Sequence, residues 1–180
     1  MRLLPVRSRF SFLREAHPQI IYCIRDGCSA VETERHLFFE CVLPSELWPV
    51  MFRDWSSFFT YTPKWIDIVL GRRPTPTDGW KEHITMLGDL WQIMRAIVLH
   101  FVWTVRNDCL FRQRAPTPLL PALRVIYTTF SAHVRGSMRR AQSEENQASI
   151  KRVLNQLRCS RSLGGFMRAN PQLFTVRFLK

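Results

Sequence analysis

The sequence is poor in acidic residues and lacks the motifs of common enzyme classes. It has 14 Asp and Glu residues against 26 Lys and Arg residues, which gives a net charge of +12 at pH 7. No G-x-S-x-G elbow, P-loop or G-x-G-x-x-G turn is present, and the few carboxylates are scattered rather than clustered as a Mg²⁺ site requires. We therefore expect a protein without catalytic activity. Its positive charge favours polyanionic partners, nucleic acid before acidic membrane surfaces.

Long apolar runs are also lacking. The longest, 96–105, is interrupted by His100 and is too short to span a bilayer. The N-terminal run ends at Arg7, which is too early for a signal peptide. Five cysteines, of which Cys109 and Cys159 lie far from the others, do not suggest a disulfide framework. These absences predict a nuclear or cytoplasmic protein in a reducing compartment, with no membrane as a partner.

What the sequence does contain is a compact set of metal-binding residue types. Three cysteines and one histidine lie within nineteen residues: Cys23, Cys28, His36 and Cys41. Their spacing, C-x4-C-x7-H-x4-C, forms two short loops that each present a pair of ligands. Three thiolates and one imidazole complete a tetrahedron around Zn²⁺ and leave no position open for a substrate. The sequence therefore predicts a structural zinc site; the alternative is three buried cysteines acting as small apolar residues beside an unrelated histidine.

Two details of this segment bear on the site. On an ideal α-helix His36 and Cys41 would point away from each other, so we expect the helix to loosen at Cys41. The following Leu43-Pro44 offers a reason, because a residue before proline avoids helical angles. Arg25 and Arg35 are close enough in sequence to offset the net negative charge of three thiolates around a divalent ion.

The rest of the pattern is helical. Apolar periodicity or helix-start signals predict helices over 34–41, 45–59, 80–112, 121–140 and 143–159. Thr33 is the expected N-cap of the first, and Pro49 is expected to push the start of the second inward. Residues 1–22 are expected to be extended or irregular, and Ser162-Leu-Gly-Gly165 to break the last helix. The predicted fold is mainly α, with a small zinc-stabilised N-terminal lobe, a helical bundle and a basic helical tail.

Positive charge is concentrated toward the C-terminus. Residues 131–180 contain ten Lys and Arg against two acidic residues. This excess predicts contacts with phosphate groups that tolerate many sequences and weaken in salt. A solvated helix face is the alternative interpretation. The candidate nucleic-acid contacts here are Arg135, Arg139, Arg140, Lys151, Arg152 and Arg158.

Two further blocks of residues carry a resemblance to a known family. The first is Glu32-Thr33-x-x-His36-Leu37-Phe38-Phe39-x-Cys41, with Trp48 shortly after, and the second is Trp103-x-x-Arg106-Asn107-x-x-x-Phe111. In order and separation they resemble the zinc-binding domain that follows the reverse transcriptase in non-LTR (LINE-type) retrotransposon polyproteins. The resemblance covers 8–115 and implies zinc ligation and an accessory role in nucleic-acid binding.

Arg106 and Asn107 of the second block have two interpretations. Arg106 could contact phosphate while Asn107 reads a base edge. Alternatively, the pair pins the end of a helix through side-chain hydrogen bonds. The second interpretation is favoured, because Trp103 continues the apolar stripe of its helix and places the pair near the helix end.

The sequence departs from the family in several ways. The family's first ligand pair is C-x2-C, so the loop here is two residues longer, and the segment after Arg114 lies outside the family pattern. The chain has no Asp-Asp pair, which two-metal polymerisation would need. We therefore expect a reverse-transcriptase-type zinc-binding domain over 8–115 and a basic helical tail over 116–180.

The function expected from these observations is that of a non-catalytic zinc-binding accessory module of retrotransposon origin. It would bind nucleic acid with low specificity, RNA in preference to DNA, and a reverse transcriptase is a further candidate partner. The alternative is a protein-interaction or inert helical domain derived from a retroelement polyprotein. Its supporting feature is the apolar stripe of the predicted helix 144–158, which would suit a groove on a partner.

Overall fold

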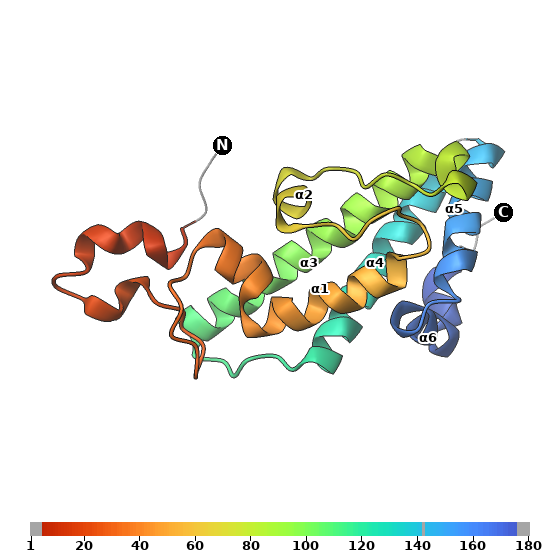
Figure 1. The fold of residues 1–180 in the computed structure, drawn as a ribbon. Coiled ribbons are helices and arrows are strands. Elements are labelled where there is room, and N and C mark those ends of the chain that lie inside the picture. The colour runs from red at the N-terminus through yellow and green to blue at the C-terminus, as the bar shows by residue number, and fades with distance from the viewer. Residues whose placement is uncertain (1–4, 142, 176–180) are drawn as a thin grey trace.

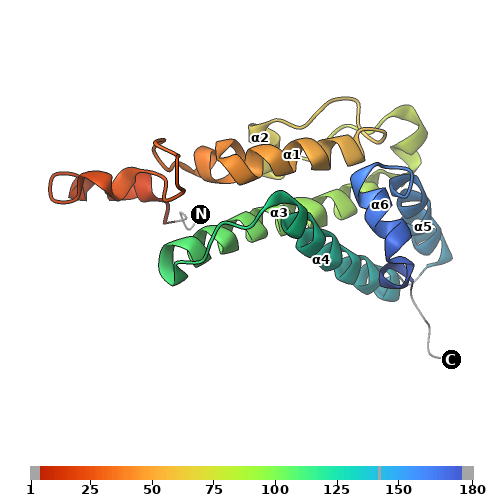
Figure 2. The same ribbon diagram turned by 90° about the horizontal axis from the view of Figure 1, so that it is seen from below.

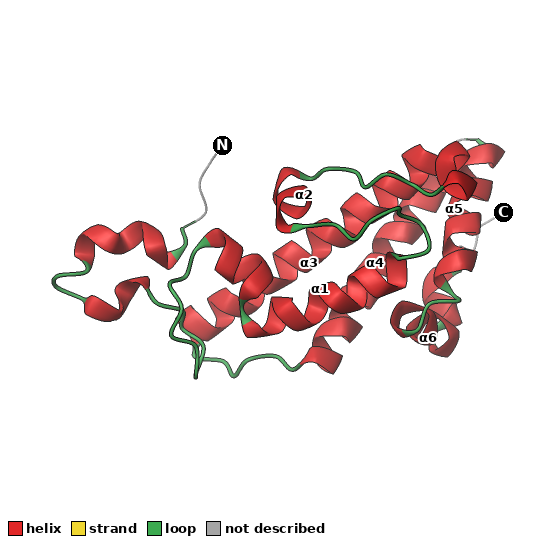
Figure 3. Cartoon of the chain, in the orientation of Figure 1, coloured by secondary structure: helices red, strands yellow, loops and turns green. Residues whose placement is uncertain are grey.

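Helices account for the regular structure of this chain. The computed structural model describes residues 5–141 and 143–175. Within these ranges there is no named strand, and the only β-type pairing consists of the isolated bridges Tyr22–Val31 and Phe59–Pro76 (Figure 3). The predicted mainly α fold is confirmed. No helix in the same ranges is both long enough and apolar enough to cross a membrane.

Three long helices form the body of the molecule. They are α1 (Val42–Trp55), α3 (Ile84–Arg112) and α4 (Leu119–Arg140), and each contacts the other two (Figure 1). The first turn of α1 contains Pro44, a place where a missing N–H costs no helical hydrogen bond. A short helix, α2 (Trp65–Leu70), follows the first of them. The smaller α5 (Glu144–Leu157) and α6 (Ser162–Ala169) lie at the end of the molecule opposite the N-terminal lobe (Figures 1 and 2).

Aromatic side chains join the three long helices. Trp55 of α1 is 1 % exposed, and its ring centroid lies 5.4 Å from that of Trp91 on α3 and 6.2 Å from that of Phe130 on α4. Both contacts are edge-to-face, the arrangement that the charge distribution of aromatic rings favours. Trp91, in the helix predicted over 80–112, therefore lies at the centre of the core.

The C-terminal segment belongs to the same core. The apolar residues of α5, namely Ile150, Val153, Leu154 and Leu157, are all buried in the hydrophobic cluster that also includes α1 and α3. The expectation that this stripe serves a partner's groove is therefore wrong, because the chain itself covers it. The predicted boundary at 115/116 falls in the loop between α3 and α4, and one core runs across it.

A buried carboxylate fixes the start of α6. Asp54 of α1 accepts hydrogen bonds from the backbone N–H of Ser162 (3.0 Å) and of Leu163 (2.8 Å), and from the Tyr127 hydroxyl (2.9 Å). Burial, and then the Asp54 charge, raise the pKa of Tyr127, which keeps its hydroxyl protonated as a donor. A negative charge at a helix N-terminus is favourable, so Asp54 joins three helices at one point.

Several sequence predictions about helix boundaries are wrong. Residues 1–22 were expected to be irregular, but they contain the 3-10 helices η1 (Arg7–Leu13) and η2 (Pro18–Ile21). The helix predicted over 45–59 begins earlier, at Val42, and runs through Pro49. Ser45, whose carbonyl would have bonded the missing proline N–H, is exposed to solvent, which lowers the cost of that break. Further 3-10 helices are η4 (Asp78–His83) and η5 (Pro171–Phe174).

Two short helices were not predicted. In α2 the Asp67 side chain accepts the backbone N–H of Lys64 (3.0 Å), a capping contact that follows Pro63. The second helix is α6, and it contains the two glycines of 162–165 that were expected to break the last predicted helix. A Cβ atom on Gly164 would lie 2.5 Å from the Arg158 carbonyl oxygen. Glycine is needed there for close approach of two segments rather than for a turn.

Candidate metal centre

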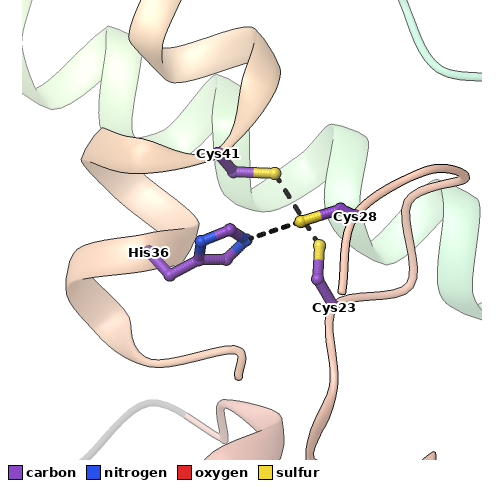
Figure 4. A group of neighbouring side chains, drawn as sticks. All are labelled: Cys23, Cys28, His36 and Cys41. Atoms are coloured by element: carbon purple, nitrogen blue, oxygen red, sulfur yellow. Dashed lines mark hydrogen bonds between the residues drawn. The ribbon is translucent and has the colours of Figure 1, made fainter. Parts of the chain in front are cut away.

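The four predicted ligands converge where the N-terminal lobe meets the helices (Figure 4). Cys23 and Cys28 come from one loop, whereas His36 and Cys41 come from the start and end of the helical turn that precedes α1. Their ligand atoms all lie within 4.8 Å of one another. The structure therefore confirms that the sequence brings these four residues together.

The distances between the ligand atoms match those of a tetrahedral site. The sulfur atoms of Cys23 and Cys41 are 3.7 Å apart, and the Cys28 sulfur is 3.4 Å from Nε2 of His36. Metal–sulfur bonds of about 2.3 Å and metal–nitrogen bonds of about 2.0 Å give tetrahedral edges of about 3.8 Å and 3.5 Å respectively. The sulfur pair is also too far apart for a disulfide bond of about 2.05 Å. These residues thus fit a metal ion held by three thiolates and one imidazole.

The first ligand pair depends on a tight turn. The backbone N–H of Cys23 bonds to the Ala30 carbonyl (2.8 Å), and the N–H of Cys28 bonds to the Arg25 carbonyl (3.0 Å). Gly27 has φ of +75°, a conformation that glycine adopts at little cost. The chain turns at Asp26-Gly27, and this turn brings both thiols to the same side of the loop (Figure 4).

The second ligand pair depends on a π-helical turn, η3 (His36–Glu40). The N–H of Cys41 donates to the His36 carbonyl (2.7 Å), the five-residue hydrogen bond that defines this wider turn. The turn brings positions five apart onto one side, and Cys41 then leaves the helix with ψ of 159°. Thr33 accepts the N–H of His36 through its hydroxyl (3.0 Å), as expected of an N-cap.

The predicted loosening of this turn is therefore confirmed, but the proposed reason is wrong. Leu43 and Pro44 both lie in α1, so the proline does not push its neighbour out of the helical region. The change occurs upstream, within 36–40. One carbonyl there finds a side-chain partner, because the indole N–H of Trp48 donates to the oxygen of Phe38 (2.7 Å).

The thiols of Cys23 and Cys41 share a hydrogen bond that shifts their pKa values in opposite directions. A hydrogen bond to Cys41 and then burial raise the pKa of Cys23 to about 12. The same hydrogen bond lowers the pKa of Cys41 against the opposing effect of burial, and the positive charge of Arg25 also lowers it. Arg25 is 8 % exposed, and its Nη2 is buried without a hydrogen-bond partner among the described residues. A buried cation beside the sulfurs suits a cluster that becomes negative when it binds a divalent ion.

Arg35 does not share this position. Its side chain is 62 % exposed and pairs with Glu40 at 2.6 Å. The expectation that both arginines offset the thiolate charge is thus met by Arg25 alone.

The two sequence blocks of the family resemblance meet beside the metal centre. Glu32, between the second and third ligands, accepts two hydrogen bonds from Arg106 of α3, at 2.6 Å from Nη2 and 3.2 Å from Nε. Phe38 stacks on Trp103, with ring centroids 6.3 Å apart. The two blocks are some seventy residues apart in sequence. These contacts join them into one local structure.

Arg106 therefore has a structural role. It is 3 % exposed, its Nη1 donates to the Asn107 side-chain oxygen (3.0 Å), and its guanidinium carbon lies 5.3 Å from the Trp103 ring centroid. The prediction that Arg106 contacts nucleic acid is wrong, because its donors face the protein interior. Asn107 is half-buried and directs its amide oxygen toward Arg106. Sequence reasoning missed Glu32 as the partner; its place inside the first block was the available signal.

The other candidate nucleic-acid contacts lie on α4 and α5. Arg135, Arg139 and Arg140 belong to α4, Lys151 and Arg152 belong to α5, and Arg158 directly follows it. All are exposed except Arg135, which is half-buried. Arg135 and Arg139 line a cavity of about 540 Å³ together with Pro171, Gln172 and Thr175. The structure thus joins two of the six in one concave site.

Comparison of the chain with models of known protein families, with curated proteins and with solved structures finds no match. The likeness to the LINE-type zinc-binding domain consequently depends on the residues of the two blocks. The contacts of Glu32 with Arg106 and of Phe38 with Trp103 give these residues a common physical purpose.

Proposed function

We propose that this chain is a non-catalytic, zinc-binding accessory module that binds nucleic acid, with RNA preferred over DNA. We further propose that it shares its origin with the zinc-binding domain of LINE-type retrotransposon polyproteins. The observation that carries the proposal is the set of four ligand atoms within 4.8 Å of one another. Three sulfurs and one nitrogen are the donors of structural zinc sites, and their number leaves no open position for chemistry on a substrate.

A zinc ion held by Cys23, Cys28, His36 and Cys41 would stabilise the folded structure by tying the N-terminal lobe to the start of α1. The lobe has few buried apolar residues of its own, since η1 contains none and η2 contains only Ile21. Small lobes of this kind commonly depend on a metal for their stability.

Zinc analysis tests the first half of the proposal. Purified protein is expected to contain one zinc per chain, and Cys28→Ser is expected to lose it because only three ligands remain. Cys159→Ser is the matched control, since Cys159 is exposed and remote in sequence from the cluster. Metal-free protein with an unchanged unfolding midpoint would argue against a structural zinc.

Nucleic-acid binding is supported by the net charge of +12 and by the cavity of Arg135 and Arg139. Guanidinium groups form paired hydrogen bonds with phosphate oxygens. Contacts of this type fix the path of a phosphate backbone without reading its bases.

A salt titration tests this second half. The logarithm of the binding constant for single-stranded RNA is expected to fall linearly with the logarithm of salt concentration, by about 0.7 for each phosphate contacted. Arg139→Gln, which removes the exposed arginine of the cavity, should reduce this slope by about 0.7. Arg112→Gln is the control, because Arg112 is 64 % exposed but already paired with Asp108. Affinity that does not respond to salt, or no affinity, would support the protein-interaction or inert alternative instead.

A further inference from the structure

A second concave site lies beside η3, the π-helical turn that begins at His36. It is a pocket of about 350 Å³ between η3, α2 and α3, and its walls are almost wholly apolar. Three aromatic rings take part, those of Phe38, Trp65 and Trp103, while Glu34 and His100 supply the polar groups. None of the contacts of the metal centre fills this pocket.

The two tryptophans of the pocket differ from those of the core. Trp65 and Trp103 are half-buried, whereas Trp48, Trp55 and Trp91 are each 1 % exposed. Each packs against another ring: Trp65 against Phe39 (6.0 Å) and Trp103 against Phe38, which itself lines the pocket. Rigid aromatic faces open to solvent are the usual platforms on which unpaired bases stack.

The polar groups of the pocket determine which nucleobase would fit it best. Glu34 is 34 % exposed, and its carboxylate is hydrogen-bonded to Arg9. An ionised carboxylate has two acceptor oxygens and no donor. Guanine presents adjacent imino and amino donors on its Watson–Crick edge, which can pair with both oxygens in parallel, as bidentate pairs do. Uracil and adenine place an acceptor beside each donor and so fit a lone carboxylate less well.

We propose that this pocket holds one guanine base of a single-stranded nucleic acid, stacked on the half-buried tryptophans and hydrogen-bonded to Glu34. The proposal rests on the nucleic-acid binding proposed above and adds a base preference to the backbone contacts. An apolar side chain of a partner protein is the competing occupant. It would offer no hydrogen-bond donor to Oε2 of Glu34, and it makes no use of the strongly positive charge of the chain.

The test uses the full, zinc-loaded chain and two labelled RNA hexamers, oligouridine with one central guanine and the same strand with an abasic site in its place. Fluorescence anisotropy is expected to show about tenfold tighter binding of the guanine strand, the usual size of one stacking contact. Trp65→Ala should abolish this difference while leaving the affinity for the abasic strand unchanged. Phe111→Ala is the matched control, because Phe111 is 75 % exposed and lies outside the pocket.

Glu34→Gln tests whether hydrogen bonds to Glu34 select guanine, independently of the stacking on tryptophan. With this variant, the preference for guanine over inosine, which lacks the amino group, should disappear. Arg9→Ala controls for the lost partner of Glu34, and it should keep the preference because the carboxylate remains. Unfolding midpoints equal to that of the parent chain ensure that each variant is folded.

The outcomes distinguish this proposal from the proposed function. Equal binding of the two strands, weakened by salt, would overturn the pocket assignment and leave backbone binding intact. If neither strand binds, the proposed function fails, and quenching of tryptophan fluorescence by guanosine monophosphate decides the pocket alone. An apolar dye that binds the pocket and is not displaced by guanosine monophosphate would also overturn the assignment, in favour of an apolar partner.

Discussion

The carboxylate of Glu32 and the guanidinium of Arg106 are 74 residues apart in sequence and meet in the interior. Their side chains are 1 % and 3 % exposed respectively. Glu32 also accepts the backbone N–H of Arg7 (3.0 Å), so its charge is satisfied from both the N-terminal lobe and α3. A buried pair adds little over an apolar replacement, but leaving one member alone is costly.

We therefore expect Arg106→Met to lower the free energy of unfolding by about 3–5 kcal/mol, because Glu32 then keeps an unpaired charge in the interior. Adding Glu32→Gln should recover most of this loss, since glutamine can still accept the Arg7 N–H. Urea unfolding of the zinc-loaded proteins measures both changes. A loss below about 1 kcal/mol for Arg106→Met would show that the pair is not buried in solution.

The pH dependence of zinc binding can also be predicted from the individual ligands. Zinc binds thiolates and neutral imidazole, and the cysteine thiols are mostly protonated at neutral pH. Zinc binding therefore releases protons, so zinc affinity rises with pH and falls as the medium becomes acidic. The raised pKa of Cys23, about 12 without metal, extends this rise well into the alkaline range.

Two to three protons should be released per zinc at neutral pH, because the lowered pKa of Cys41 reduces its share; this corresponds to about a hundredfold to thousandfold change in affinity for each pH unit. Calorimetric titration in two buffers with different ionisation enthalpies counts them. Cys159→Ser should leave the count unchanged. Release of fewer than two protons would mean that one of the three thiols is not a ligand.

At the scale of elements, the α5–α6 corner contains two adjacent glycines in very different surroundings. A Cβ atom on Gly164 would lie 2.5 Å from the Arg158 carbonyl oxygen, whereas one on Gly165 would meet nothing closer than 3.9 Å. The first position therefore requires glycine, and the second only tolerates it.

Gly164→Ala is expected to destabilise the fold by about 1–3 kcal/mol, since backbone atoms must move to admit the methyl group. Gly165→Ala should instead be neutral or stabilising by up to about 1 kcal/mol, because alanine favours the helix. Thermal unfolding of the two variants gives the comparison. Equal midpoints would mean that α6 does not pack closely on the end of α5.

The elements with strong periodicity could be predicted from the sequence, and those that depend on tertiary contacts could not. The stripe over 80–112 matches α3 closely, since one face of it supplies the core. In contrast, α6 forms despite its glycines because Asp54, over a hundred residues earlier, binds its first N–H groups. Nothing local in 162–165 reveals this contact.

The candidate metal centre was more predictable than the helices around it. Its ligands lie within one short segment, so spacing alone limits the geometry. The π-helical turn at 36–40 was anticipated as a loosened end, but its cause was misassigned. The partner of Arg106 was missed because a sequence does not tell whether an arginine faces solvent or a buried carboxylate.

At the scale of the whole molecule, one hydrophobic core extends from Val6 to Phe174. Ile126 and Phe130 of α4 are fully buried against it, and the buried stripe of α5 adds to it. The segments before and after 115 therefore bury each other's apolar surface, although they differ in charge.

A fragment ending at residue 115 is accordingly expected not to fold alone, even with zinc bound, because the faces of α1 and α3 that contact α4 would be exposed to water. Nuclear magnetic resonance spectra of the fragment should show poor amide dispersion, while the full chain shows wide dispersion. Addition of a separate 116–180 fragment should restore part of it. A well-folded 1–115 fragment would establish two independent domains.

The wide turn that presents His36 and Cys41 has one more consequence, which concerns chain length. A π-turn holds one residue more than the corresponding α-turn, so deleting a single residue between these ligands would leave them four positions apart. On an ordinary α-helix positions four apart share one face, which would still suit a common ion. The liganding pair is thus compatible with two segment lengths, and insertions or deletions that would destroy most coordination sites need not destroy this one.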